Sequence, residues 1–174
     1  MLTAERYSIR PMLESDLEQV LSWRNHPNIR RYMYTQHKIT LEEHIAWYQN
    51  TCNKPERHML VFEINNEPAG FANINKSASI NIADWGFYVA PGSVKGTGKK
   101  LGISVLNYAF KFLKLHKICG QALSYNIPSV NFHTGLGFLQ EGVLRDQFFD
   151  GHRYYDIVHF GLLANEWKIK EEEL

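Results

Sequence analysis

The sequence predicts an α/β domain with a mixed, mostly antiparallel sheet of about seven strands flanked by helices. Three observations predict it: a mainly helical first third, short strand-like runs from residue 58 onward, and a glycine-rich loop that joins a strand to a long amphipathic helix. This order is typical of a sheet with helices on both faces. The 174 residues suit one domain over 1–167, followed by a charged tail at 168–174 that we expect to be solvated or frayed.

The helical first third is predicted from two capping boxes. A short strand near residues 7–12 precedes Ser15 and Glu18, whose spacing places a serine and a glutamate at a helix start. Thr40 and Glu43 repeat that spacing at the start of the next helix. Apolar residues recur with helical periodicity behind both boxes.

The remainder of the chain is predicted from alternation and turn residues. Residues 58–64 and 68–74 form a hairpin around the turn at 65–67, and a third strand runs from about 80 to 90. The helix behind the glycine loop presents Leu101, Val105, Ala109 and Phe112 on one face. We then expect a strand at 116–124, a short helix capped by Asn126, a strand from 136, and a last hairpin turning at residues 150–151.

Bulk properties exclude several classes of function. A net charge of +1 is not typical of proteins that bind nucleic acid through its phosphates, and no run of apolar residues approaches a spanning helix or a signal peptide. We therefore expect a cytoplasmic protein without nucleic-acid or membrane partners. Cys52 and Cys119 form no CxxC pair, and the eight histidines form no HExxH or similar cluster, so no disulfide framework and no metal are predicted.

The loop at residues 92–100 is a candidate anion site. A strand that enters a glycine loop and then a helix gathers unpaired amides and the positive end of the helix dipole. Gly96 and Gly98 let the backbone approach an anion, and Lys95, Lys99 and Lys100 add charge. The alternative is an ordinary strand-to-helix turn with solvated lysines.

Two other phosphate loops are excluded by spacing. A Walker A loop needs a glycine five residues before Gly98, where Ser93 stands, and a hydroxyl after Lys99, where Lys100 stands. A dinucleotide loop needs glycine at position 101, which is Leu101, and an acidic residue about 20 positions further on, where none stands.

Two spaced motifs resemble the GCN5-related N-acetyltransferases (GNAT). Residues 84–91, DWGFYVAP, with KGTG at 95–98 are similar to that family's strand and pyrophosphate loop. Asn126-Ile-Pro-Ser129, Phe132-His133, Leu136-Gly-Phe138 and Glu141-Gly142 are similar to its second signature. The resemblance covers roughly residues 5–167 and implies an enzyme that moves an acetyl group from acetyl-CoA to a primary amine.

The resemblance also implies which residues hold acetyl-CoA. Main-chain groups near Phe87, Tyr88 and Val89 would bind the pantetheine and the acetyl carbonyl. The pyrophosphate would lie on the amides of Lys95, Gly96, Thr97, Gly98, Lys99 and Lys100. The second signature would add Asn126, Ser129 and Phe132, and no metal is implied.

Proton transfer is assigned to two residues. His133 stands where many members carry a tyrosine that protonates the leaving thiolate, and histidine can supply that proton. Asp84 stands where some relatives carry a glutamate that removes the amine proton through water. The alternatives are a packed histidine and a solvated carboxylate. Gln121 cannot act as the base, and Asn73 could only help to hold the water.

The first third resembles the amino-sugar N-acetyltransferases of pseudaminic acid synthesis, which acetylate a UDP-linked 4-amino-4,6-dideoxy sugar for flagellin glycosylation. By this resemblance, Arg24 and His44 would face the nucleotide diphosphate with Asn75 and Lys76, while Met33 and Tyr34 would hold the methyl group of the deoxy sugar. It also implies a homodimer. The alternatives are that these residues are only core and ion-pair partners, that the acceptor is a protein N-terminus, or that the chain is a non-catalytic acyl-CoA-binding module.

Overall fold

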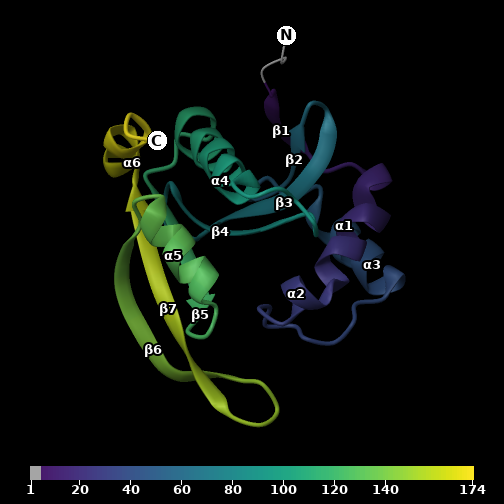
Figure 1. Cartoon of the computed structure of the whole chain (residues 1–174). Helices are drawn as coiled ribbons and strands as arrows, with labels where there is room; N and C mark the ends of the chain where they lie inside the picture. Colours follow the sequence, from purple (N-terminus) through teal and green to yellow (C-terminus); the bar gives the residue numbers. More distant parts are fainter. Residues whose placement is uncertain (1–4) are drawn as a thin grey trace.

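The computed structural model describes residues 5–174, so residues 1–4, with which the predicted domain begins, lie outside the described part. Seven strands form one sheet in the order β1-β2-β3-β4-β5-β7-β6 (Figure 1). Among the strand pairs of residues 5–174, only β4–β5 is parallel. The predicted mixed sheet is confirmed, with strands β1 (Tyr7–Pro11), β2 (Arg57–Ile64), β3 (Glu67–Lys76), β4 (Ile82–Val89), β5 (Lys117–Leu123), β6 (Leu139–Phe149) and β7 (Tyr154–Leu163).

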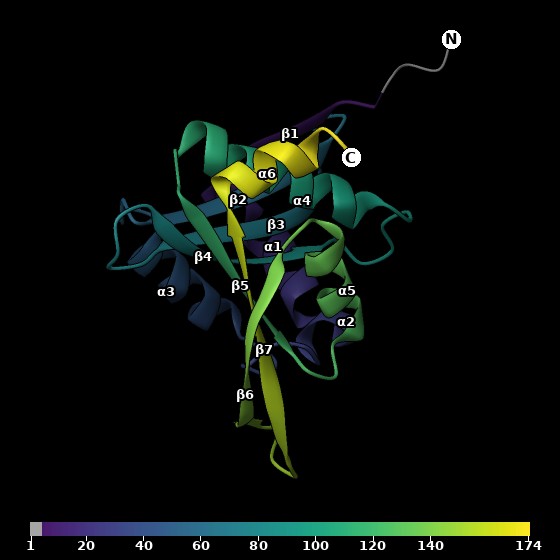
Figure 2. The same ribbon diagram turned by 90° about the vertical axis from the view of Figure 1, so that its left-hand side faces the viewer.

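Helices cover both faces of this sheet. They are α1 (Leu17–Asn25), α2 (Pro27–Arg30), α3 (Leu41–Thr51), α4 (Thr97–Asn107), α5 (Ile127–Gly135) and α6 (Ala164–Glu171). One core cluster joins α4 and α6 to the sheet, with α5 packed against it, and a second joins α1 and α3 to the opposite face. Figure 2 shows α3 and α5 on opposite sides of the strands. The hairpin β6–β7 extends beyond the other strands (Figure 1).

The first predicted capping box is wrong and the second is confirmed. A 3₁₀ turn at Glu14–Asp16 precedes α1, and Asp16 rather than Ser15 accepts a hydrogen bond, from the backbone N–H of Leu13 at 2.8 Å. Asp16 also pairs with Arg10, which fixes its carboxylate before the helix starts. At α3, the Thr40 hydroxyl and the Glu43 carboxylate bond each other's backbone N–H as predicted.

The helix behind the glycine loop ends in a π-helical turn at Tyr108–Phe112. Leu101, Val105 and Ala109 are fully buried as predicted, but Phe112 is 71% exposed. A π-helical turn holds one residue more than an α-helical turn, so it rotates the following side chains away from the expected face. The prediction for Phe112 is therefore wrong.

The predicted frayed tail is also wrong in part, because residues 168–171 continue helix α6. Trp167 anchors this helix, with 1% of its surface exposed and its indole N–H donating to Asn107 Oδ1 at 3.0 Å. Within residues 5–174, the longest apolar helical stretch is too short to cross a membrane.

The feature that positions the site is the separation of β4 from β5. The two strands pair only at residues 82–84 and 117–119, and the pair that ends this contact is Asp84 with Cys119. Beyond it, each strand continues without the other: β4 stays paired with β3, and β5 with β7. A V-shaped opening thus forms in the middle of the sheet, with Asp84 at its apex.

Candidate functional site

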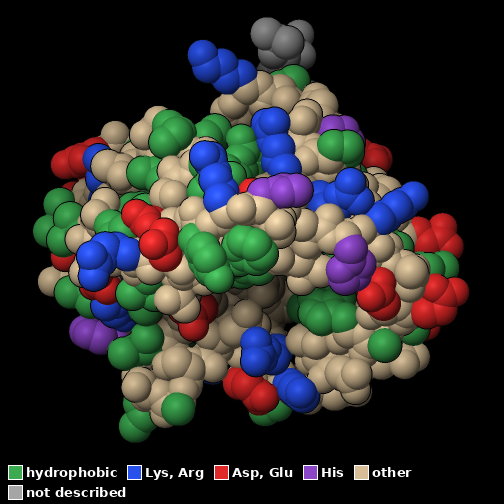
Figure 3. Space-filling model, turned by 90° about the horizontal axis from the view of Figure 1, so that it is seen from below, with side chains coloured by type: hydrophobic (Ala, Val, Ile, Leu, Met, Phe, Trp, Pro, Cys, Tyr) green, Lys and Arg blue, Asp and Glu red, His purple; other side chains and the backbone are tan. Residues whose placement is uncertain are grey.

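A cleft of about 970 Å³ occupies this opening and reaches both faces of the sheet. Strands β4 and β5 form its walls. On one face of the sheet the cleft is lined by α5, and on the other face by α1, α3 and the segment between α2 and α3. The face seen from below in Figure 3 is hollowed at its centre. A cleft of this size holds a ligand of several hundred daltons.

The glycine loop lies at the start of α4. Gly96 is the N-cap with φ +96°, a conformation that favours glycine, and no side chain caps the helix. The Thr97 backbone N–H donates to the Val94 carbonyl at 3.2 Å, whereas within the described residues the amides of Gly98 and Lys99 have no capping partner and can receive an anion. The lysines differ: Lys95 and Lys99 are exposed, but Lys100 donates to Glu5 at 2.6 Å. The expected contribution of Lys100 to pyrophosphate binding is thus weakened.

Thr97 lies in the same loop with its side chain turned inward. It is 2% exposed, and its buried hydroxyl has no hydrogen-bond partner among the described residues. The hydroxyl therefore does not face an incoming phosphate. Its backbone N–H donates to the Val94 carbonyl at 3.2 Å, so the expected contact is left to the amides of Gly98 and Lys99.

The residues expected to hold the pantetheine lie on the β4 wall of the cleft. Phe87, Tyr88 and Val89 line the cleft on β4, and Phe132 of α5 packs on Phe87 with ring centroids 4.5 Å apart. Gly98 also lines it, and a Cβ there would lie 3.7 Å from the Phe132 ring. The loop amides and this apolar wall fit the pyrophosphate and pantetheine of acetyl-CoA.

Asn126 and Ser129 lie at the start of α5. The Asn126 side chain accepts a hydrogen bond from the Ser129 backbone N–H at 3.2 Å, and both residues line the cleft. The Asn126 carboxamide oxygen is thus committed to the helix cap. We expect its NH₂ group, rather than its oxygen, to meet the donor.

His133 is placed differently from the expected acid. It is 1% exposed, its ring stacks on Phe160 at 4.7 Å, and its Nδ1 lies 2.8 Å from the Ser129 carbonyl. The indole N–H of Trp85 donates to its Nε2 at 3.2 Å. Because a carbonyl only accepts and an indole N–H only donates, Nδ1 carries the proton and Nε2 has none to give. Burial lowers the pKa of His133, so the ring is neutral, and this geometry contradicts the expected acid role.

Asp84 lies in a polar row that crosses three strands. It is exposed, lines the cleft, and stands opposite Asn75 on β3 and Cys119 on β5. Partners in register point to the same face of a sheet, so these side chains share the face of α1 and α3. Burial raises the pKa of the Cys119 thiol, which keeps it protonated.

Asn73 is held next to this row by the absence of a side chain at Gly86. A Cβ at Gly86 would lie 2.6 Å from Asn73 Oδ1, so only glycine lets this amide cover β4. Gln121 of β5 also lines the cleft, and its Oε1 accepts a hydrogen bond from the Tyr34 hydroxyl at 2.8 Å. Gly86 stands directly opposite Asn73 on the neighbouring strand. The sequence alone does not give this strand register, so it could not predict the contact.

Arg24 and His44 lie together in the half of the cleft lined by α1 and α3, and Arg24 carries the positive charge there. Arg24 Nη2 donates to the Thr35 carbonyl at 3.0 Å, while its buried Nη1 and the buried Nε2 of His44 have no partner among the described residues. Burial lowers the pKa of both groups, and the nearby Arg24 charge lowers that of His44 further. None of the ion pairs formed by residues 5–174 includes Arg24.

The remaining predicted acceptor residues divide into two groups. Met33, Tyr34 and Asn75 line the cleft, and Tyr34 packs against Phe148 of the β6–β7 hairpin at 5.7 Å. Lys76 is exposed at the end of β3 and is not among the lining residues. Residues that the sequence analysis did not assign include Trp47, which stacks on His44 at 5.0 Å. Across residues 5–174, no group of three or more His, Cys, Asp or Glu side chains is arranged to hold a metal ion.

Comparison with known proteins agrees with this architecture. Residues 6–139 match the model of the acetyltransferase (GNAT) domain family. An uncharacterized N-acetyltransferase of Bacillus subtilis, derived from the SPbeta prophage, is 30% identical over 126 residues, 71% of each chain. The acetyltransferase PseH of Campylobacter jejuni is 32% identical over 104 residues, 58% of this chain and 62% of PseH. The crystal structure of spermidine N-acetyltransferase from Vibrio cholerae, in complex with CoA and spermine, has a TM-score of 0.86 at 24% identity and covers 93% of this chain and 98% of that one.

Family, fold and cleft together identify the donor and the reaction class. The donor is acetyl-CoA, and the alternative of a non-catalytic acyl-CoA-binding module is not favoured. The chain belongs to the acetyltransferase (GNAT) family and is an acetyl-CoA-dependent N-acetyltransferase.

Proposed function

We propose that the enzyme transfers acetyl to the 4-amino group of a UDP-linked 4-amino-4,6-dideoxy sugar by direct transfer through a ternary complex. The observation that carries this proposal is the Arg24–His44 pair, two buried nitrogens on the acceptor side of the cleft that have no partner among residues 5–174. A guanidinium donates well to phosphate oxygens, and a neutral imidazole does so from the ring nitrogen that carries its proton. An anionic acceptor would therefore satisfy groups that the folded chain leaves unsatisfied.

A polyamine acceptor fits this half of the cleft less well. Glu43 and Asp84 are the carboxylates among the described residues that line it, and Glu43 already bonds His37 at 3.0 Å and the Thr40 backbone. A polycation would lie beside Arg24, whose charge no carboxylate balances, and like charges in a partly buried site repel strongly. Spermidine is nevertheless the second candidate, because the spermidine acetyltransferase of Vibrio cholerae has nearly the same backbone.

The apolar part of the cleft suits a deoxy sugar. Met33, Trp47 and Phe71 line it, and the rings of Trp47 and Phe71 pack edge to face at 6.0 Å. A sugar that carries a methyl group in place of a hydroxyl needs an apolar contact at this position. This agrees with the resemblance of the first third of the chain to the amino-sugar N-acetyltransferases.

Acetyl-CoA supplies an activated acyl group, and the chain's residues supply position and proton removal. We assign proton removal from the amine to Asp84, through a water held by Asn73 and Asn75, because all three share the α1/α3 face at the apex of the opening. The backbone near residues 87–89 orients the donor. Since His133 has no proton available on Nε2, we assign protonation of the leaving thiolate to solvent in the open cleft.

The test is a thiol-release assay with acetyl-CoA and a panel of amines. The panel contains a UDP-linked 4-amino-4,6-dideoxy sugar, spermidine and N-terminal peptides. We expect turnover of the nucleotide sugar with kcat/KM at least 100-fold above the other amines. Turnover confined to spermidine or to the peptides would overturn the proposal, the latter in favour of protein N-terminal acetylation. The homodimer stays a prediction, which light scattering checks.

A further inference from the structure

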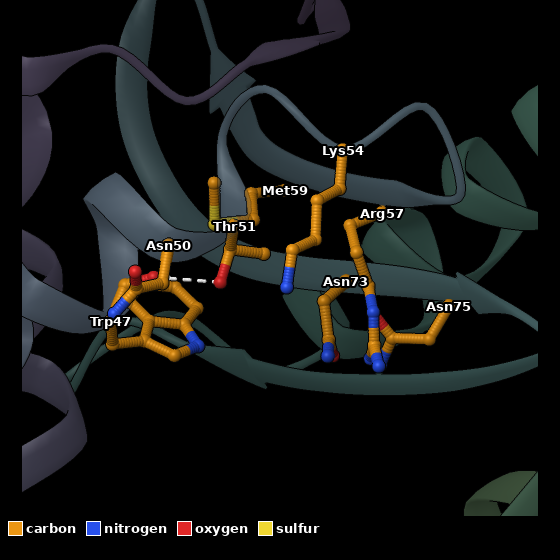
Figure 4. Close-up of a pocket in the computed structure, with 8 residues that line it drawn as sticks. All are labelled: Trp47, Asn50, Thr51, Lys54, Arg57, Met59, Asn73 and Asn75. Carbon is orange, nitrogen blue, oxygen red and sulfur yellow. Dashed lines mark hydrogen bonds between the residues drawn. The ribbon is translucent and has the colours of Figure 1, made fainter.

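A second pocket of about 430 Å³ adjoins the acceptor half of the cleft (Figure 4). It lies between the C-terminal end of α3 and the paired ends of β2 and β3. Trp47, Asn73 and Asn75 line both cavities, so the side pocket continues the cleft. The family resemblance assigned no role to Lys54 or Arg57, which line this pocket and not the cleft.

The side pocket is cationic and polar. Lys54 and Arg57 line it together with the amides of Asn50, Asn73 and Asn75, and no carboxylate is among its lining residues. Neither Lys54 nor Arg57 takes part in the ion pairs found across the described part of the chain. Figure 4 shows the polar ends of Lys54, Arg57, Asn73 and Asn75 gathered on one side, with the indole nitrogen of Trp47 facing them. Two unpaired cations beside donor groups and an indole suit a phosphate joined to a planar base.

The strand register fixes where this pocket lies relative to the reacting amine. Arg57 on β2 stands opposite Asn75 on β3, which stands opposite Asp84 on β4. Two inter-strand spacings separate Arg57 from Asp84, about 9.5 Å between backbones. A 4-amino sugar carries its amine and its anomeric phosphate on opposite sides of the ring, so its phosphate side points toward the side pocket when the amine lies at Asp84.

We propose that the side pocket binds the nucleoside monophosphate end of the acceptor, with Lys54 and Arg57 pairing with its phosphate. The proposal rests on the proposed function and extends it. The diphosphate then runs between Arg24 and His44 on one side and the two cations Lys54 and Arg57 on the other. The nucleoside monophosphate end is remote from the reacting amine. Contacts to it therefore determine which acceptor is bound rather than the rate of acetyl transfer.

Direct binding tests the pocket without any turnover. Calorimetry with UDP as the probe compares the parent with a Lys54→Gln/Arg57→Gln double variant. A matched control, Arg6→Gln/Lys168→Gln, removes one arginine and one lysine at exposed positions outside both pockets. We expect UDP to bind the parent and the control alike and at least tenfold more weakly to the double variant. No binding of UDP to the parent, or equal binding to all three, would overturn the inference.

Kinetics separates this outcome from failure of the proposed function. The double variant should raise KM for the UDP-linked amino sugar at least tenfold with little change in kcat, and leave KM for the same sugar as its 1-phosphate unchanged. An equal rise for both acceptors means that the pocket does not contact the nucleoside end, which contradicts the inference. If spermidine alone is turned over, the proposed function fails, while UDP calorimetry still decides whether the side pocket holds a nucleotide.

Discussion

The indole N–H of Trp85 donates to Nε2 of His133 inside the core, between a strand of the sheet and helix α5. Trp85 lies on the opposite face of β4 from Asp84, so this bond ties α5 to the strand that carries the proposed base. Gly120 makes room for it, since a Cβ there would lie 2.5 Å from His133 Nε2. The histidine at this position thus joins two walls of the cleft.

This bond predicts a structural phenotype for His133. His133→Ala removes a fully buried ring, leaves the Trp85 N–H without a partner and removes the side-chain hydrogen bond to the Ser129 carbonyl. We expect the free energy of unfolding to fall by about 2–5 kcal/mol, measured by urea denaturation. Under conditions where His133→Gln stays folded, kcat should fall by less than about tenfold, whereas loss of a general acid costs 10²–10⁴ in rate.

The stability of the enzyme should also fall in mild acid. Burial lowers the folded-state pKa of His133, so between that pKa and the unfolded value of about 6.5 the unfolded chain binds a proton that the folded chain does not. The contribution of His133 is therefore complete above about pH 6.5 and is lost as the pH falls toward the folded pKa. Urea midpoints at pH 7.5 and 5.5 check this. His133→Gln should lessen the decrease without abolishing it, because burial also lowers the pKa of His44 and His58.

The sequence predicted the sheet well because its strands carry local signals. Alternation and the Asp150-Gly151 turn place the final hairpin, and the two hydrogen bonds predicted at Thr40 and Glu43 form. It failed at Phe112 and at residues 168–171, where the outcome depends on distant partners. The π-helical turn carries Phe112 to the surface, and α6 persists because Trp167 is buried against Asn107. The hydrophobic periodicity of a single segment predicts neither the π-helical turn nor the persistence of α6.

A prediction for the polar row concerns Gly86. Gly86→Ala places a methyl group 2.6 Å from Asn73 Oδ1 and pushes that amide away from the apex of the opening. A displacement of about 1 Å in a positioned group can cost 10²-fold in rate, so we expect kcat to fall by about that factor in the thiol-release assay. Gly135→Ala, where nothing lies within 4 Å of the new Cβ, is the matched control.

A double variant distinguishes displacement from general damage. Asn73→Ala removes the atom that the new methyl group would meet. Adding Gly86→Ala to it should therefore cost much less than Gly86→Ala costs in the parent, a non-additivity expected only for residues in contact. Additive losses would mean that Gly86 acts through something other than Asn73.

The acceptor proposal predicts a specific response at Arg24. Arg24→Lys keeps the charge but loses the planar fork, including the donor to the Thr35 carbonyl. We expect KM for the UDP-linked amino sugar to rise about tenfold, since a hydrogen bond to a charged group is worth about 1.5–3 kcal/mol, while KM for acetyl-CoA stays the same. Arg31→Lys on the neighbouring exposed surface serves as the control. An unchanged acceptor KM in Arg24→Lys would remove this residue from the acceptor site.

The sequence predicted the candidate site well where the β4 strand motif positions the backbone. It predicted the site less well where a side chain forms a hydrogen bond or ion pair with a distant residue. Phe87, Tyr88 and Val89 line the cleft because the strand motif fixes their place on β4. Lys100 and His133 occupy the expected positions, yet Glu5 and Trp85 engage their functional atoms. Glu5 lies 95 residues from Lys100 in the chain, and no local pattern announces such a pair. The side pocket likewise joins α3 to β2 and β3, which only the folded register brings together.

Asp84 gives the test of the proposed chemistry. At the apex of the β4–β5 opening it is exposed to solvent and aligned with Asn75, so a carboxylate there can take a proton from a bound water. Asp84→Asn keeps the shape of the side chain and removes the basic oxygen. We expect kcat to fall by 10²–10⁴, the usual effect of losing a general base, with the acetyl-CoA dissociation constant from calorimetry unchanged. Glu67→Gln, an exposed change at the far end of β3, should have no effect on either quantity. Equal turnover by Asp84→Asn and the parent would show that the amine loses its proton by another route.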